Sequence, residues 1–165
     1  MKQIGNIFLQ VDIKQISFKQ ILPVWSGKLW PERKSDIEPV SAIDQNGFID
    51  MTILKFEPIF WGAYFKHELV GVISTHPTET DMYRLRGVFV EEKYRSHRVG
   101  KKLVDTVAKY AEAKKAIALW TLARKANKNF YEHCGFSIGK EINTYEFGPH
   151  YLMKKTSPEI MPVQS

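Results

Sequence analysis

Apolar runs broken by short polar turns mark the middle of the chain. Residues 56–66 and 69–75 have the composition of strands, and Lys66-His67-Glu68 between them is typical of a hairpin turn. A second turn over residues 77–81 leads into a third apolar stretch, residues 82–90. The pattern therefore predicts three antiparallel strands in succession.

The N-terminal part combines a weak strand, a helical stretch and a loop. Residues 4–13 alternate loosely, as in a strand, and residues 14–30 carry apolar side chains at helical spacing, interrupted by Pro23. Residues 31–50 are rich in Pro, Asp, Ser and Gly. They are predicted to be a loop with a short helix around residues 39–44.

The second half of the chain mixes helical and strand patterns. Val99, Leu103, Val107 and Ala111 recur at a spacing of four with lysines opposite, so residues 99–115 are predicted to form an amphipathic helix. The remaining elements are a buried strand over 116–122, a short helix over 125–133 closed by Gly135, and a last hairpin of 136–142 and 151–155.

This order of elements predicts an α+β protein. Three antiparallel strands come first and a strand–helix–strand crossover follows, which favours a mixed, mostly antiparallel sheet. We expect six to seven strands flanked by about four helices. At 165 residues, the chain 1–165 is predicted to be a single domain.

Composition narrows the class of protein. The chain is 44% apolar and 25% charged, as in an ordinary globular domain, and no run approaches the roughly 18 apolar residues of a membrane span. Its N-terminus lacks the apolar core of a secretory signal, and the single cysteine, Cys134, excludes an internal disulfide. We therefore expect a cytoplasmic protein with no membrane partner. The five histidines lack metal-ligand spacing, so no metal is expected.

A net charge of +6 suits an anionic partner, which could be a nucleotide-like cofactor, a nucleic acid or an acidic substrate. Residues 88–101 favour the nucleotide-like cofactor, because a short strand ends there in a basic turn that leads into the amphipathic helix. Free N–H groups at a helix start bind phosphate, and Arg95, Arg98 and Lys101 add positive charge. The alternative is a basic helix start that holds no ligand.

The segment Arg95-Ser96-His97-Arg98-Val99-Gly100 resembles the acetyl-coenzyme A loop of the GNAT acetyltransferase superfamily. That loop has Arg or Gln, two residues, Gly, one residue, and Gly or Ala. Arg95 and Gly100 match, and Arg98 stands where the first glycine is usual. A departure at this position matters, since glycine lets backbone N–H groups approach phosphate closely.

Two further segments resemble the same family in the expected order. Residues 130–136, Phe-Tyr-Glu-His-Cys-Gly-Phe, are similar to the tyrosine-containing helix that closes the family's core, and residues 86–90 are similar to its fourth strand. Gly87 fits the bulge found in that strand. The resemblance covers about residues 53–155, which we expect to be the core, with 156–165 as a tail.

The resemblance implies an acetyl-coenzyme A site and assigns residues to it. Backbone groups of the fourth strand would hold the pantetheine arm as an added strand, and the basic turn would hold the pyrophosphate. The implied cofactor-binding residues are Val88, Phe89, Val90, Arg95, Ser96, His97, Arg98, Val99, Gly100 and Lys101.

The implied general acid is Tyr131, which would protonate the coenzyme A thiolate; the alternative is that its ring only packs with Phe130 and Phe136. The general base is less defined, because the fourth strand lacks a carboxylate before Glu91. His150 is our candidate, with Asp81 and His76 as substitutes.

Three side chains are candidates for binding the acceptor amine. Arg86 and Arg124 follow adjacent strands and could together bind a substrate carboxylate; the alternative is ion pairing with Glu132 or Glu141. Trp30 is expected to line the amine pocket. Trp25 and Trp61 fit core packing better, and Cys134 fits a buried thiol.

Together these features predict an N-acetyltransferase that moves an acetyl group from acetyl-coenzyme A to a primary amine by direct attack. Arg98 and the missing strand carboxylate leave open a non-catalytic coenzyme A-binding or sensor protein of the same fold. A nucleic-acid-binding module is the weaker alternative, because the chain has no array of basic residues interleaved with aromatics. The resemblance also allows a homodimer, and the acceptor amine stays unidentified.

Overall fold

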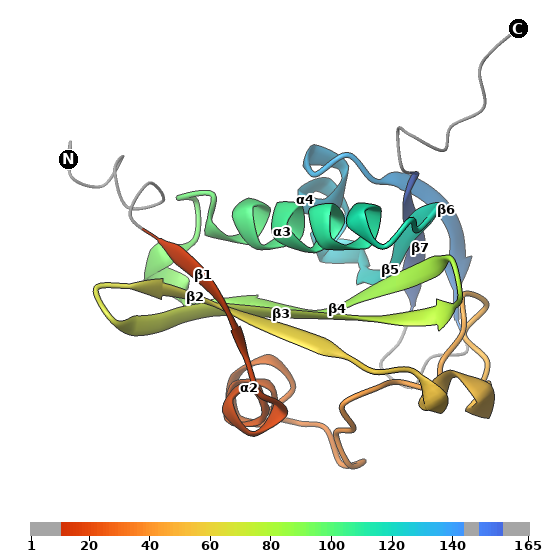
Figure 1. Ribbon diagram of the computed structural model, residues 1–165, viewed down its shortest axis with the longest axis horizontal. Helices are drawn as coiled ribbons and strands as arrows, with labels where there is room; N and C mark the ends of the chain where they lie inside the picture. Colours follow the sequence, from red (N-terminus) through yellow and green to blue (C-terminus); the bar gives the residue numbers. More distant parts are fainter. Residues whose placement is uncertain (1–10, 144–148, 157–165) are drawn as a thin grey trace, which may run out of the picture.

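A seven-stranded sheet runs through the protein with helices on both faces (Figure 1). The structure, a computed structural model, describes residues 11–143 and 149–156. The strands are β1 (Asp12–Ile16), β2 (Ile59–Phe65), β3 (Glu68–Glu79), β4 (Met82–Val90), β5 (Ala118–Arg124), β6 (Ser137–Ile142) and β7 (His150–Thr156). Their order in the sheet is β1-β2-β3-β4-β5-β7-β6.

All neighbouring strands are antiparallel except β4 and β5. The β2–β3 hairpin turns at Lys66 and His67, whose φ angles of 51° and 70° match the two-residue turns that suit twisted strands. The parallel β4–β5 pair needs a crossover, which α3 (Val99–Ala113) supplies.

The helices divide between the two faces. Helix α3 covers one face, and α4 (Lys128–His133) lies on the same side, whereas α2 (Phe18–Val24) covers the other (Figure 1). Within the described residues the shorter elements are the π-helix η2 (Trp25–Leu29) and the 3-10 helices η3 (Met51–Lys55), η4 (Glu92–Tyr94) and η5 (Lys125–Asn127).

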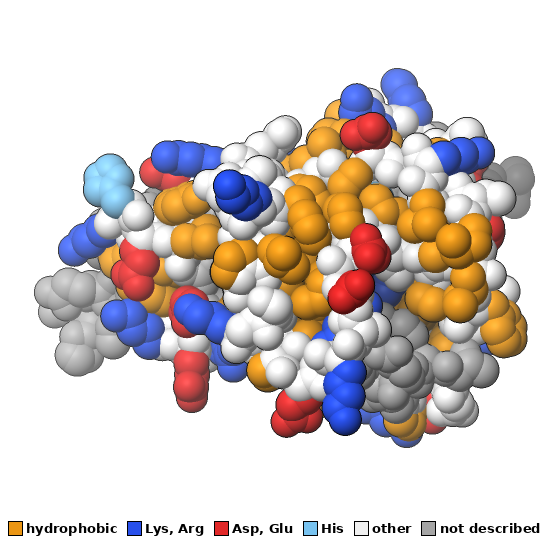
Figure 2. Space-filling model, turned by 90° about the horizontal axis from the view of Figure 1, so that it is seen from below, with side chains coloured by type: hydrophobic (Ala, Val, Ile, Leu, Met, Phe, Trp, Pro, Cys, Tyr) orange, Lys and Arg blue, Asp and Glu red, His pale blue; other side chains and the backbone are white. Residues whose placement is uncertain are grey.

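Each face has its own apolar core. Under α3 the helix buries the predicted stripe, with Leu103 and Val107 against Leu85 of the sheet. On the opposite face, Ile21 and Trp25 pack on Phe60 and Val72, and burying side chains of this size gives about 1.5–3 kcal/mol each. The α2 side of the molecule carries broad areas of hydrophobic side chains (Figure 2).

The sequence patterns located most elements correctly. Strand β4 has the predicted bounds, α3 lies within the predicted 99–115, and β5 begins two residues later than predicted. Gly135 ends α4 with a φ of 95°, as its predicted role requires. The mixed, mostly antiparallel sheet is confirmed, with three α-helices in the described part of the chain.

The loop before η3 differs from the prediction. Residues 39–44 form no helix; a single bridge joins Ile43 and Ile49 instead. The carboxylate of Asp44 accepts hydrogen bonds from the backbone N–H groups of Asn46 and Phe48, at 2.9 and 3.0 Å. Such local side-chain bonds to the backbone compete with a helix and favour a turn.

The predicted turn at 77–81 is shorter than expected, because β3 continues to Glu79 and only Thr80 and Asp81 form the turn. Strand β2 ends its pairing with β3 at Ile59↔Thr75, so Pro77 has a strand neighbour only on the β4 side. Proline is tolerated where its missing N–H faces no partner strand.

The N-terminal strand ends later, and the helix begins later, than predicted. Residues 14–16 belong to β1, and the helix begins only after Ser17, whose hydroxyl accepts from the N–H of Gln20 while the Gln20 side chain accepts from the N–H of Ser17. The predicted strand over 4–13 lies mostly outside the described residues. In the described ranges, no helix has the length and apolar character needed to cross a membrane.

A buried histidine on β3 makes folding sensitive to acid. His76 is fully buried, and this burial, with smaller effects from Arg84 and Arg86, lowers its pKa from 6.5 to about 3. The unfolded chain therefore binds more protons below pH 6.5, so stability is lost as the pH falls from 6.5 toward 3. We expect His76 to account for roughly 2 kcal/mol of the stability lost between pH 7 and pH 5.

Urea unfolding at pH 7 and pH 5 measures this loss. His76→Gln should lose less stability between the two pH values than the wild type does, by the contribution assigned to His76. His67→Gln, which changes an exposed turn histidine, should lose as much as the wild type. Equal pH dependence in the wild type and His76→Gln would contradict the assignment.

Candidate active site

The sheet opens between β4 and β5. The two strands pair only from Met82↔Ala118 to Arg84↔Trp120, so the edge of β4 beyond Arg84 has no neighbouring strand. A pocket occupies this opening, with walls that include Trp30, Arg84, Arg86, Arg124, Tyr131 and His150. All five predicted catalytic and substrate-binding residues, from distant parts of the chain, thus line this pocket together with Arg84.

A bulge at Gly87 bends β4 where it leaves its partner. Gly87 has a φ of 72°, and the pairing with β3 shifts register between Val72 and Ser74. The indole N–H of Trp25 donates to the Gly87 carbonyl at 2.9 Å, and a Cβ on Gly87 would lie 2.4 Å from the Trp25 ring. The position therefore requires glycine both for its φ angle and for the close approach of the indole.

The predicted phosphate turn connects β4 to α3 through η4. Helix α3 begins at Val99 with no side-chain cap, and its first internal bond runs from the N–H of Lys102 to the carbonyl of Arg98 at 3.0 Å. The N–H groups of Val99, Gly100 and Lys101 donate to no acceptor in the described part of the chain. With no acidic residue in the first turn, this helix start is suited to an anion.

The backbone explains why glycine is usual at position 98. Arg98 has a φ of 66° and Ser96 a φ of 73°, both in the left-handed region. This conformation costs a non-glycine residue about 1–2 kcal/mol. Arg98 thus keeps the conformation that a glycine would adopt and adds an exposed guanidinium beside the open helix start.

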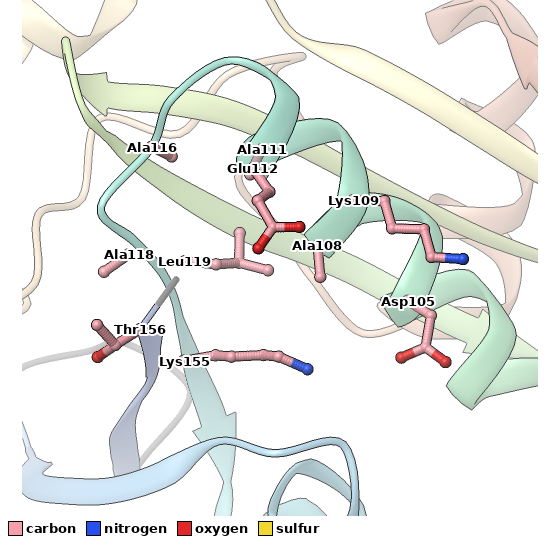
Figure 3. A pocket seen from close by; sticks show the side chains of 10 residues that line it. All are labelled: Asp105, Ala108, Lys109, Ala111, Glu112, Ala116, Ala118, Leu119, Lys155 and Thr156. Atoms are coloured by element: carbon pink, nitrogen blue, oxygen red, sulfur yellow. The ribbon is translucent and has the colours of Figure 1, made fainter. Parts of the chain in front are cut away.

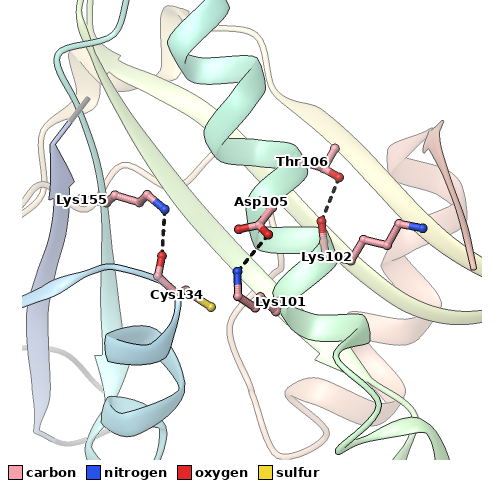
Figure 4. Close-up of polar contacts among 6 residues, drawn as sticks. All are labelled: Lys101, Lys102, Asp105, Thr106, Cys134 and Lys155. Carbon is pink, nitrogen blue, oxygen red and sulfur yellow. Dashed lines mark hydrogen bonds and ion pairs between the residues drawn. The ribbon is translucent and has the colours of Figure 1, made fainter. Parts of the chain in front are cut away.

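The other basic residues of the turn have partners within the protein. Arg95 donates through Nε to the Val90 carbonyl at 2.7 Å, and Lys101 pairs with Asp105 at 3.1 Å along the helix (Figure 4). Both ends of the latter pair are exposed, so it is weak and screened by salt. Of the three predicted cations, only Arg98 has a side chain that makes no hydrogen bond or ion pair with described residues.

Tyr131 enters the opening from the α3 side. Tyr131 is buried and its ring packs against Phe130 and Phe136. It also forms part of the pocket wall, so packing does not separate it from the opening. Burial raises the pKa of its hydroxyl well above 10, while the Thr121 hydroxyl and the charge of Arg84 act in the opposite direction. The phenol is therefore protonated at neutral pH.

Helix α4, which carries Tyr131, packs closely on the start of α3. A Cβ on Gly100 would lie 3.0 Å from the Phe130 ring, so glycine permits this approach. Cys134, at the end of α4, is buried with a pKa raised to about 11, and its carbonyl accepts from Lys155 (Figure 4). The thiol is thus a core group, as predicted, and not a nucleophile.

Of the candidate bases, His150 alone lies in the pocket wall. It sits on β7 opposite Arg124 of β5. His76 is buried and does not line the pocket, and Asp81 lies in the β3–β4 turn, where its carbonyl accepts from the N–H of Ile117.

The alternative ion pairs proposed for the two arginines do not form. Glu132 pairs with Lys128 at 3.2 Å and Glu141 with Lys125 at 3.3 Å. Trp25 and Trp61 belong to the cores, as expected, whereas Trp30 is half-buried at the pocket.

Sequence reasoning missed Arg84, which lies two residues before Arg86 on the same strand. The spacing could have indicated it, because residues i and i+2 of a strand face the same side.

A second hollow lies between α3 and the strands β5 and β7 (Figure 3). Its charged side chains include Glu112, Asp105 and Lys155, but it lies away from the sheet opening and contains none of the predicted site residues. In the part of the chain that the structure describes, no three His, Cys, Asp or Glu side chains gather in a way that could hold a metal ion.

Comparison with known proteins agrees with this geometry. The chain matches the acetyltransferase (GNAT) family over residues 21–136, more than half of its length. The chain belongs to the GNAT acetyltransferase family.

Two curated proteins are similar to part of this chain. The protein is 32% identical over 106 residues to the uncharacterized N-acetyltransferase YitI of Bacillus subtilis, covering 58% of this chain and 68% of YitI. It is 27% identical over 93 residues to a streptothricin acetyltransferase of Escherichia coli, covering 54% of this chain and 53% of that protein. Family membership identifies this GNAT protein as an acyltransferase.

Solved structures share the fold over nearly the whole chain. An aminoglycoside 6'-N-acetyltransferase complexed with coenzyme A superposes with a TM-score of 0.68 at 19% identity, covering 93% of this chain and 99% of the other. Ard1 from Thermoplasma volcanium gives 0.66 at 18%, covering 89% and 97%. At such identities the likeness shows the GNAT fold alone.

The bulge offers a test of how the opening is held. We expect Gly87→Ala to destabilise the protein by about 2 kcal/mol or more, because it strains the backbone and displaces Trp25. Gly27→Ala is the control, since a Cβ there meets nothing within 4 Å. Chemical denaturation of both variants measures the difference; equal stabilities would show that the Trp25–Gly87 contact does not hold the strand.

Proposed function

We propose that this GNAT protein is an N-acetyltransferase that moves the acetyl group of acetyl-coenzyme A to a primary amine. The observation that carries the proposal is the continuity of two open backbone features. The unpaired edge of β4 leads through η4 and the basic turn into the uncapped start of α3, as a ligand with an amide-containing arm and a pyrophosphate requires.

The residues present fit coenzyme A. Val88 of β4 lines the opening, and beyond Arg84 the β4 edge has no β5 partner, so the pantetheine amides would pair with it there as an added strand. The pyrophosphate would accept hydrogen bonds from the N–H groups of Val99, Gly100 and Lys101, with Arg98 adding charge. The coenzyme A complex of a protein with the same fold supports this assignment.

The proposed reaction is direct transfer without an acyl-enzyme. The amine nitrogen attacks the thioester carbonyl, a C–N bond forms, the C–S bond breaks, and the electron pair leaves on sulfur. A backbone N–H of β4 near Phe89 or Val90 would stabilise the developing oxyanion. Tyr131, protonated at neutral pH, gives its proton to the thiolate, and His150 accepts the proton that the amine loses.

Reversing the charge of Arg98 should weaken the binding of acetyl-coenzyme A and leave the binding of the amine nearly unchanged. We expect Arg98→Glu to raise the KM for acetyl-coenzyme A at least tenfold with little change in the KM for the amine. Lys109→Glu, the same charge change on the exposed side of α3, is the control. Arg98→Gly should keep most of the binding, because it relieves the left-handed strain while losing one charge. Equal rises in both KM values would contradict the phosphate site.

Removing the Tyr131 hydroxyl should slow the acetyl-transfer step without weakening the binding of acetyl-coenzyme A. For Tyr131→Phe we expect the single-turnover rate of thiol release to fall at least tenfold, with acetyl-coenzyme A affinity nearly unchanged. Tyr110→Phe, a half-buried tyrosine on α3 that packs against Trp61, is the matched control. An unchanged single-turnover rate would remove Tyr131 from the mechanism. Binding of the donor without thiol release for any amine would favour the non-catalytic alternative.

A further inference from the structure

Thr121 lies at the point where β5 leaves β4. The last pair between the two strands is Arg84↔Trp120. Thr121 is the next residue and is paired with Met153 of β7. It is 4% exposed, it lines the opening, and its hydroxyl donates to the Leu85 carbonyl of β4 at 2.9 Å. A side-chain bond thus takes the place of the strand pairing that ends one residue earlier.

The same hydroxyl lies beside the phenol of Tyr131. Tyr131 projects from α4, is buried and lines the same opening. A side-chain hydrogen bond with Thr121 lowers the pKa of the phenol, against the larger and opposite effect of burial. A bond that lowers the pKa of a phenol is one donated to the phenolate, since it stabilises the charged form. Thr121 therefore has two acceptors within reach, the Leu85 carbonyl and the phenolate oxygen.

The Thr121 hydroxyl serves these two acceptors in turn and not together. A threonine hydroxyl has a single proton to donate, and it keeps lone pairs that accept. While Tyr131 is protonated, Thr121 donates to the Leu85 carbonyl, as the structure shows. Once Tyr131 is ionised, rotation about the Cβ–Oγ bond of Thr121 directs the same proton to the phenolate. This change of partner moves a hydrogen atom and leaves the heavy atoms in place.

The general acid needs such a donor because its own acidity is low. A thiol of ordinary pKa, about 8.5, is a stronger acid than a phenol of pKa about 10, and burial raises the pKa of Tyr131 further. Each pKa unit of this mismatch opposes transfer of the proton from phenol to thiolate about tenfold. A neutral hydroxyl that turns toward the phenolate reduces the mismatch without placing a further charge in the opening.

We propose that Thr121 is a positioning residue for the general acid, and that its hydroxyl turns from the Leu85 carbonyl to the Tyr131 oxygen during acetyl transfer. This inference rests on the proposed function and deepens the role of Tyr131 in it. In that step the O–H bond of Tyr131 breaks, an S–H bond forms on coenzyme A, and the electron pair of the broken bond stays on the phenolate oxygen. Thr121 keeps its own proton throughout. The proton that His150 takes from the amine returns through solvent to the phenolate, so the cycle is balanced.

The test measures single-turnover release of thiol from acetyl-coenzyme A, with the best acceptor in a panel of alkylamines, diamines, amino acids and lysine-containing peptides. We expect Thr121→Val to lower this rate about fivefold or more with the affinity for acetyl-coenzyme A nearly unchanged. Thr121→Ser, which keeps the hydroxyl, should restore most of the rate. If the valine variant does not fold, Thr121→Ala takes its place.

Thr75→Val is the matched control and should keep the wild-type rate. Thr75 is also buried, and it also donates to a carbonyl of β4, that of Arg84, at 2.7 Å. It does not line the opening, so the control removes the same kind of bond away from Tyr131.

The Tyr131→Phe background separates a role in proton transfer from a role in holding the strands. If Thr121 acts through the phenol, Thr121→Val has no further effect on the rate in Tyr131→Phe, and the two changes are non-additive. If Thr121 only holds β5 to β4, Thr121→Val lowers the rate by the same factor in both backgrounds. That result, or an unchanged rate in Thr121→Val, would overturn the inference while leaving the acetyltransferase proposal intact. If no amine of the panel releases thiol, the acetyltransferase proposal fails, and the role of Thr121 fails with it.

Discussion

The separation of β4 from β5 is the feature on which the rest of the site depends. The strands pair over three residues, and beyond Arg84 and Trp120 they part. The bulge at Gly87 turns β4 away, and Trp25 stabilises the bulge by donating to its carbonyl from the opposite face. One side-chain bond still spans the opening, from the Thr121 hydroxyl to the Leu85 carbonyl at 2.9 Å. The backbone N–H and C=O groups of β4 beyond Arg84 are thereby left without a partner in β5. They are available to pair with the amide groups of a ligand.

Strand alternation then gives the two sides of the opening different chemistry. Leu119 and Ala123 of β5 face α3, and Thr121 lies with them beside Tyr131. Trp120 and Arg124 face the other way, toward the buried arginines of β4. A proton donor therefore stands on the side of the open helix start, and guanidinium groups stand on the other.

Local patterns were enough to predict the elements, but not the contacts between them. The stripe from Val99 to Ala111 and the apolar run of β4 depend on periodicity within one segment, and both were located correctly. Pro77 belongs to β3 and not to a turn, because a proline is tolerated there only where β2 no longer pairs with β3. Where that pairing stops is a long-range property. The i, i+2 spacing places Arg84 on the same face as Arg86, but its burial depends on Ser41 and Trp120, which lie 43 and 36 residues away. The family motifs led to Arg98, yet only the backbone shows that it adopts a glycine-like conformation.

The buried arginines also tie the loop before η3 to the pocket. Arg86 holds the carbonyl of Glu38, and Arg84 holds Ser41, so residues 38–41 are anchored through the same guanidinium groups that line the opening. The bond to Ser41 uses a neutral acceptor, which satisfies one donor of Arg84 without balancing its charge, and Arg84 forms no ion pair with any described residue. The fold therefore accepts a desolvated cation on β4, a cost that is typical of functional sites, where local stability is given up.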